Sequence, residues 1–314
     1  MRFNKPPLPL PEQLAKLKLR GLQVPDDTTG RTLLRVIGYY RFSAYTLPFQ
    51  QGNLPDKPFR AGVSINDIQA LYTFDRELRL LVMDALERIE IGLRSALVNR
   101  MCLEHGAHWF MDPTHFAPGF DHAKLIAGIE NSLEMDPGAP RPRKKHSEVF
   151  INHYYQKYGD PRLPPAWMVA ETMALGTLSR VFSGLNRVED RQFIAGGFCY
   201  DEAILRPWLH TLNYVRNLCA HHARLWNRQL VIKSQTPKKH AKRVLVSDRL
   251  YAVVVVLFDL LRALQPHTRW GWRFVQLMGT YPQADLRAMG FPPGWDKDSI
   301  WPQSEAEAGG PVAP

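Results

Sequence analysis

The chain of 314 residues contains only three cysteines, and they lie far apart, at Cys102, Cys199 and Cys219. So few scattered cysteines exclude a disulfide framework, and we expect a reducing, cytoplasmic setting. Long apolar runs are also missing, since the longest, residues 250–258, is far short of the ~20 residues that a membrane helix needs. The first residues lack the apolar stretch of a secretion signal. We therefore expect a cytoplasmic protein without a membrane partner.

No segment alternates apolar and polar residues for long enough to predict a β-sheet, and no internal repeat is found. Apolar residues recur instead at spacings of three and four, most clearly along residues 71–96, which predicts one long helix starting at Ser64 or Asn66. We expect an all-α fold. Further helices are expected at residues 11–20, 27–36, 39–49, 124–133, 147–158, 166–185, within 187–198, from Asp201 with a restart at Pro207, 250–264 and 269–278.

The expected organisation is a single helical domain over residues 1–301. It comprises an N-terminal helical extension (1–62), a core (63–280) and a coil that packs aromatic residues back onto the body (281–301). Residues 302–314 are rich in Pro, Gly and Ala and carry few charges, so we expect a disordered tail.

Acidic residues are scarce in one region of a chain whose formal net charge is +10. Residues 206–249 hold ten Lys or Arg and one acid, Asp248. A surface of one sign concentrates a polyanion, which favours RNA as partner, although a merely basic surface gives the same count.

The most unusual stretch lies within that region, at residues 211–228. Its helical apolar pattern also carries arginines, asparagines and two adjacent histidines. These types suit RNA cleavage, because an imidazole can take a proton from the 2′-hydroxyl or give one to the leaving 5′-oxygen. A guanidinium can hold the phosphate as negative charge accumulates in the transition state.

On a helix, Asn217 and His221 share one face, one turn apart, with Arg224 following on the same side. Arg216 is displaced from His221 by about 140° around the axis. One copy of the chain therefore does not place the two side by side. Two copies related by a twofold axis can, and we expect a composite site in a homodimer.

The bare pattern of Arg, four residues and His occurs four times, starting at Arg100, Arg141, Arg216 and Arg262. Only the third has an asparagine, a doubled histidine and the following Arg-Leu-Trp-Asn-Arg. We discount the second, because it falls in a loop rich in proline, and read His267 of the fourth as a surface helix end.

This context resembles a known signature. The segment Arg216-Asn217-x-x-Ala220-His221-His222-x-Arg224-Leu225-Trp226-Asn227 is similar to that of the Abi (abortive infection) proteins, the AbiD/AbiF-like group of the HEPN superfamily. Further similar blocks run from about Lys5 to Trp301, at residues 5–21, 37–45, 71–94, 165–179 and 289–301. HEPN proteins are helical, mostly metal-independent ribonucleases.

The resemblance implies a HEPN-type helical bundle and an endoribonuclease that acts as a toxin-like effector in phage defence. It implies Arg216, Asn217 and His221 as catalytic residues, and products with a 2′,3′-cyclic phosphate and a 5′-hydroxyl. An inhibitory RNA or antitoxin would be a fitting further partner. No cofactor or metal is implied.

Supporting roles fall to residues around this site. His222 is a second proton-transfer group or a structural histidine, Arg224 supports the site, and Glu90 or Arg94 of the long helix orients His221. The candidate RNA contacts are basic residues. They are Arg141, Arg143, Lys144 and Lys145 in one loop, Arg228 at the end of the motif stretch, and Lys238 and Lys239 after it.

Three other readings stay open. HEPN relatives include inactive ones, so the chain can be an RNA-binding module without catalysis. It can be a structural, protein-binding domain in which Arg216 and Asn217 bridge buried groups. The third reading is a metal site, at Cys219 and His222 or at His105 and His108. Each of these pairs lacks a second pair of ligands nearby.

Overall fold

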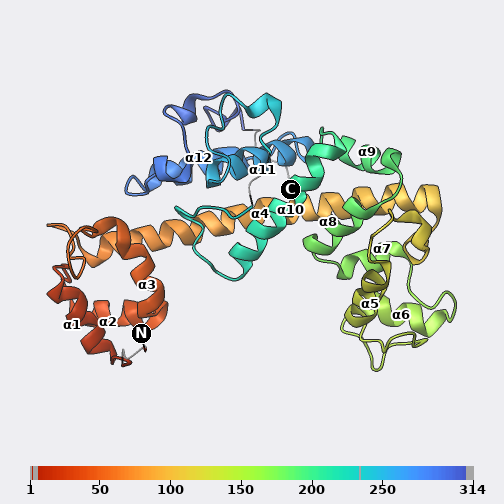
Figure 1. Cartoon of the computed structure of the whole chain (residues 1–314), viewed down its shortest axis with the longest axis horizontal. Helices are drawn as coiled ribbons and strands as arrows, with labels where there is room; N and C mark the ends of the chain where they lie inside the picture. The colour runs from red at the N-terminus through yellow and green to blue at the C-terminus, as the bar shows by residue number, and fades with distance from the viewer. Residues whose placement is uncertain (1, 3–5, 233–234, 309–314) are drawn as a thin grey trace. The chain divides into compact units, whose positions relative to one another are not determined.

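The computed structural model describes residues 2, 6–232 and 235–308. Within these ranges every regular element is a helix and only isolated β-bridges occur, which confirms the all-α prediction (Figure 1). Lys5 and the predicted tail beyond residue 308 lie outside the described residues. The α-helices are α1 (Leu10–Leu19), α2 (Asp27–Ile37), α3 (Tyr39–Thr46), α4 (Ile65–His105), α5 (His122–Ser132), α6 (Val149–Lys157), α7 (Ala166–Val169), α8 (Leu175–Gly184), α9 (Val188–Gly196), α10 (Glu202–Ala220), α11 (Leu250–Leu264) and α12 (Trp270–Thr280).

The chain forms two compact units. Unit 1 comprises Met1–Arg79 with Gln276–Leu286, and unit 2 comprises Leu80–Val275 with the chain from Arg287 on. The boundary between the units lies inside α4. The predicted core begins earlier, at residue 63, in the loop before this helix.

Helix α4 begins where the sequence predicts. The Ser64 hydroxyl accepts a hydrogen bond from the Asn66 N–H at 3.0 Å, which satisfies one of the free donors of the first turn.

Asp75 and Arg79, one turn apart on this helix, form a buried ion pair inside unit 1. The Tyr45 hydroxyl of α3 donates to Asp75 at 2.6 Å. This pair therefore belongs to the core of unit 1 and not to an exposed face of α4.

Unit 2 places α10 against α8 and α9 (Figure 1). Asp201 caps α10 as predicted, accepting from the Ala203 N–H at 2.9 Å. The predicted restart at Pro207 is wrong, because α10 is continuous from Glu202 to Ala220. Pro207 lies near the start of α10, where its missing N–H removes one bond of the ladder without ending the helix.

The single helix predicted at residues 166–185 is also wrong. Helix α7 passes into a short 3₁₀ turn, Ala170–Thr172, and Met173 and Ala174 are extended before α8 begins. The guanidinium of Arg94 explains the break. Its Nε donates to the Ala170 carbonyl at 2.9 Å and its Nη2 to the Met173 carbonyl at 3.0 Å. A side chain of α4 therefore bonds both carbonyls at the break, and the Ala170 carbonyl also accepts the Met173 N–H at 3.0 Å.

Helix α11 is the apolar centre of unit 2, and its residues 250–257 are all buried. It lies close to α4, since a Cβ at Gly92 would lie 2.7 Å from Leu264. Ser247 and Asp248, just before α11, are residue types that cap helices, but the N-cap is Arg249 and no side chain caps it. The Asp248 carboxylate instead accepts from the Gln229 side chain at 2.8 Å.

After Trp301, residues 302–308 form bends and turns, and Ala308 is buried. No helix in the described part of the chain is long and apolar enough to cross a membrane.

Candidate active site

Helix α10 presents one polar face and one apolar face. Leu212, Val215 and Cys219 are buried, as the sequence predicts. His210 and His221 are exposed and Asn217 is half-buried, and all three lie on the opposite side by helical spacing. The side chain of Arg216 lies between these two faces. The helix therefore turns Asn217 and His221 to solvent and directs Arg216 toward a neighbouring element.

That element is α4. Arg216 lines an open pocket of about 490 Å³ in unit 2, whose other walls come from residues of α4, namely Leu80, Met83, Asp84, Glu87, Glu90, Ile91 and Arg94. The structure thus brings Arg216 together with Glu90 and Arg94, the two residues of α4 named from the sequence. Asp84 and Glu87 were not expected here, although helical spacing from Glu90 and Arg94 places them on the same side of α4.

Glu90 and Arg94 are tied to each other as well as to the α7–α8 break. Arg94 Nη2 lies 3.1 Å from Glu90 Oε1, and both side chains are largely buried. With two backbone carbonyls also bound, Arg94 has a fixed position at the edge of the pocket. His221 does not line this pocket, so the prediction that Glu90 or Arg94 orients His221 remains a prediction.

Arg216 and Asn217, its neighbour in the sequence, contact each other only weakly. Arg216 Nη1 lies 3.5 Å from Asn217 Oδ1, at the limit of a hydrogen bond. His221 is the C-cap of α10, and its N–H donates to the Asn217 carbonyl at 3.0 Å. Over the described residues, no hydrogen bond of the His221 imidazole is present. This leaves Asn217 and His221 close to each other at the helix end, with the imidazole accessible.

The turn after α10 has the geometry of a Schellman motif. The His222 N–H donates to the Cys219 carbonyl at 3.0 Å, and the Ala223 N–H donates to the Leu218 carbonyl at 2.9 Å. His222 consequently has a left-handed backbone with φ of 55°, at the position where glycine is usual. This turn was not predictable from the sequence, because a histidine occupies the glycine position.

Downstream, the motif closes back onto the body of unit 2. Leu225 and Trp226 are buried, so this tryptophan is a core residue. Arg224 lies with its guanidinium carbon 5.7 Å from the centre of the Trp226 ring, and Arg228 Nε donates to the Arg224 carbonyl at 2.7 Å. Arg224 and Arg228 are half-buried.

Two of the other Arg-x₄-His pairs are structural. Arg100 Nε and His105 Nε2 both bond the buried carboxylate of Asp190, at 2.8 and 2.9 Å. Burial alone would raise the pKa of Asp190, but these bonds hold it below its ordinary value. His146 is buried in the loop between α5 and α6. Its Nε2 donates to the Ser132 carbonyl and its Nδ1 accepts from the Glu148 N–H.

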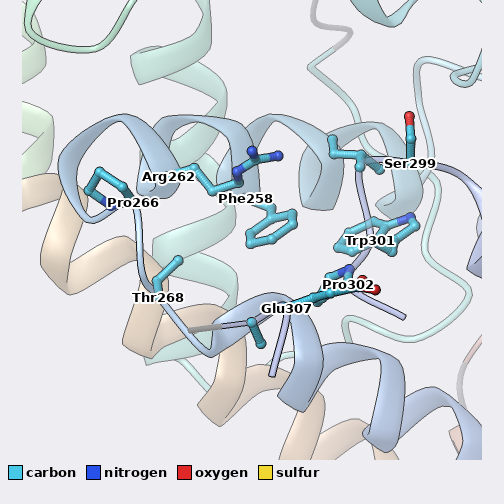
Figure 2. A pocket seen from close by; sticks show the side chains of 10 residues that line it. Phe258, Arg262, Pro266, Thr268, Ser299, Trp301, Pro302 and Glu307 are labelled. Carbon is cyan, nitrogen blue, oxygen red and sulfur yellow. The ribbon is translucent and has the colours of Figure 1, made fainter. Parts of the chain in front are cut away.

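The members of the fourth pair lie apart. The guanidinium of Arg262 lies over the Phe258 ring, 5.7 Å from its centre, beside Trp301 in a small pocket (Figure 2). His267 lines a different, open hollow. In the third pair, His221 is exposed at the C-cap of α10 and Arg216 lines a pocket beside it. Among the four pairs, this one alone carries the asparagine and the doubled histidine of the motif.

The basic residues predicted to contact RNA are mostly exposed, but several are already paired. In the loop after α5, Arg143 lies 3.6 Å from Asp136 and Lys144 lies 3.3 Å from Glu134. Arg141, Lys145 and Lys238 are exposed. Lys239 lies 2.5 Å from Asp259, with half its side chain exposed.

Among the residues that the structure describes, no group of three or more His, Cys, Asp or Glu is placed to hold a metal ion. Cys219 is buried and His222 is exposed. The open readings that used Cys219 with His222, or His105 with His108, gain no further ligand here.

The family model of the Abi-like proteins matches residues 32–227, more than half of the chain and all of the motif up to Asn227. The chain belongs to this family. No curated protein and no solved structure matches it. The match of this Abi-like protein includes α4 and α10, the helices that carry Arg94 and Arg216.

Proposed function

We propose that this Abi-like protein is a metal-independent endoribonuclease of the HEPN type that acts as a toxin-like effector in abortive infection. The observation that carries the proposal is the end of α10. There an accessible imidazole, an asparagine and an arginine in a neighbouring pocket lie within six residues of the chain. The family supplies the link to abortive infection, and the chemistry of the side chains supplies the reaction.

In this reaction the 2′-hydroxyl of the RNA loses its proton and attacks the adjacent phosphorus. The bond to the 5′-oxygen breaks, and that oxygen gains a proton, which leaves a 2′,3′-cyclic phosphate and a 5′-hydroxyl. His221 serves one of the two proton transfers, as general base or acid, and His222 or a water molecule serves the other. Arg216 donates two hydrogen bonds to the phosphate as its charge rises. Asn217, beside both, fixes a phosphate oxygen or the imidazole.

The proposed active form is a homodimer. Within one chain, Arg216 faces α4 while His221 faces solvent, so the two do not act on one phosphate from a single α10. A twofold axis near the polar face of α10 would bring His221 of one copy to Arg216 of the other. Two such sites would form per dimer.

The test is incubation of the purified protein with end-labelled RNA in EDTA. Cleavage is expected to persist, to give cyclic phosphate ends, and to fall by at least about 100-fold in His221→Ala and in Arg216→Ala, the usual contribution of acid–base and electrostatic groups. Cleavage that requires added zinc would contradict the proposed chemistry.

The second candidate is an RNA-binding module without catalysis. One observation favours it, namely that the pocket of Arg216 also holds Asp84, Glu87 and Glu90, whose charges oppose a phosphate in a single copy. Tight RNA binding without cleavage, at protein concentrations where the dimer has formed, would decide for this candidate. RNA cleavage lost in both variants would decide against it.

A further inference from the structure

A second hollow in unit 2 gathers cationic side chains that the proposed reaction does not use. It has a volume of about 730 Å³ and is lined by Arg88 of α4, Arg273 of α12, and the connection between α11 and α12, with His267 and Arg269. Three guanidiniums and an imidazole therefore surround one open space.

The carboxylates near this hollow do not balance its arginines. Asp84 pairs with both Arg88 and Arg273, at 2.8 and 2.9 Å, so two guanidiniums share one carboxylate. Arg269 pairs with Glu305. The three arginines and two carboxylates leave the hollow with an excess of one positive charge, before His267 is counted.

The ion pairs of the three arginines also differ in how easily a phosphate can replace the carboxylate. Arg88 is held further by Gln265 Oε1 at 3.0 Å and by Thr268 Oγ1 at 3.3 Å. The side chains of Arg269 and Arg273 are 41% and 54% exposed, and that of Glu305 is 61% exposed. Exposed ion pairs contribute little stability, so a phosphate can replace their carboxylates at small cost. Arg88 forms the fixed wall, and Arg269 and Arg273 are the available donors.

The hollow adjoins the pocket of Arg216. Asp84 lines that pocket and at the same time bonds Arg88 and Arg273 of the hollow, so one side chain separates the two. Both spaces lie along the same stretch of α4. Arg88 and Arg94 are about 9 Å apart along the helix axis, which a few nucleotides of a strand span.

We propose that this hollow binds a backbone phosphate of the RNA whose scissile phosphate lies at Arg216. The inference rests on the proposed function and assigns a path to its substrate, along α4 from the pocket of Arg216 to Arg269 and Arg273. Glu305 competes with the phosphate for Arg269.

The experiment measures the affinity of the full-length protein for a fluorescein-labelled single-stranded RNA by anisotropy, over a series of salt concentrations. It uses the His221→Ala background so that the RNA stays intact. Arg269→Gln and Arg273→Gln are each expected to weaken binding by about two- to fivefold, the range of an exposed ion pair. Each should also lower the slope of log K against log salt by about 0.7, the value for one phosphate contact on a single strand.

Glu305→Gln provides a variant of opposite sign, expected to tighten binding about two- to fivefold because it frees Arg269. The matched control is Arg187→Gln, which removes the same charge from an exposed arginine at the start of α9, also in unit 2. It should leave the slope unchanged. Inorganic phosphate at equal ionic strength should compete no better than chloride.

Unchanged slopes in both Arg269→Gln and Arg273→Gln, with RNA still bound, would overturn the inference and leave the proposed function standing. Equal slope losses in the Arg187→Gln control would also overturn it, because they would show a diffuse charge effect. Strong competition by inorganic phosphate would assign the hollow to a free anion. If the background protein binds no RNA at all, the inference and the proposed function fail together.

Discussion

At the scale of single residues, the carboxylate of Asp75 links α3 to α4 inside unit 1. It is fully buried, it pairs with Arg79, and it accepts the Tyr45 hydroxyl. Burial, and then the charge of Asp75, raise the pKa of Tyr45 above its ordinary value, so the tyrosine stays a donor. A buried guanidinium that loses this carboxylate is costly, because burial keeps water from taking the place of the lost partner.

We expect Asp75→Ala to lower the free energy of unfolding by about 3–5 kcal/mol, measured by urea denaturation. The control is Lys18→Ala, which removes the exposed ion pair with Asp27 and should cost less than about 1 kcal/mol. Equal losses in the two variants would show that burial of the Asp75 pair has no energetic consequence.

His222 gives a second prediction at this scale. A residue with a Cβ in the left-handed region carries a strain of about 1–2 kcal/mol, which glycine avoids. His222→Gly should therefore raise the free energy of unfolding, by about 0.5–1 kcal/mol after the added freedom of the unfolded chain is counted. If His222 serves only the turn, RNA cleavage should persist in this variant. Loss of cleavage with raised stability would instead make His222 the second proton-transfer group.

At the scale of elements, two helical glycines distinguish close packing from open space. A Cβ at Gly271 of α12 would lie 2.3 Å from the Phe258 ring of α11, and that ring is stacked on Trp301 and has little room to move. A Cβ at Gly128 of α5 meets nothing within 4 Å.

We expect Gly271→Ala to destabilise the protein by about 1–3 kcal/mol through overpacking. Gly128→Ala should stabilise it by about 0.5–1 kcal/mol, because alanine favours a helix interior over glycine. Thermal denaturation of the two variants measures both signs. A gain in Gly271→Ala would contradict the tight contact between α11 and α12.

Local patterns in the sequence were enough for the elements whose ends are set by their own residues. Ser64 and Asp201 start α4 and α10 because their side chains bond the N–H groups that follow. The break between α7 and α8 was not predictable in this way, since the side chain that satisfies its carbonyls, Arg94, is some eighty residues earlier in the chain. Asp248 likewise bonds Gln229 rather than the helix it precedes.

The candidate site also has features that local sequence predicts and features that depend on distant residues. The opposite faces of α10 and the displacement of Arg216 from His221 come from helical spacing alone and could be predicted. That Arg216 faces Asp84 and Glu87 depends on the packing of α10 near α4, which no local pattern encodes. The left-handed backbone of His222 could not be read either, because glycine is its usual signal.

At the scale of the whole molecule, the excess of positive charge is not spread evenly over unit 2. The pocket of Arg216 holds Asp84, Glu87 and Glu90, whereas the adjoining hollow holds Arg88, Arg269 and Arg273. A single copy therefore presents a cationic hollow beside a pocket of mixed charge. In the proposed reaction, a second copy would add His221 to the pocket of Arg216.

The measurement that tests this most directly mixes two inactive proteins, Arg216→Ala and His221→Ala, under conditions in which subunits exchange. If each site takes Arg216 from one copy and His221 from the other, half of the dimers are mixed and each has one intact site. The mixture should then recover about a quarter of wild-type RNA cleavage. A mixture that stays as inactive as its components, while the wild-type protein cleaves, would contradict the composite site.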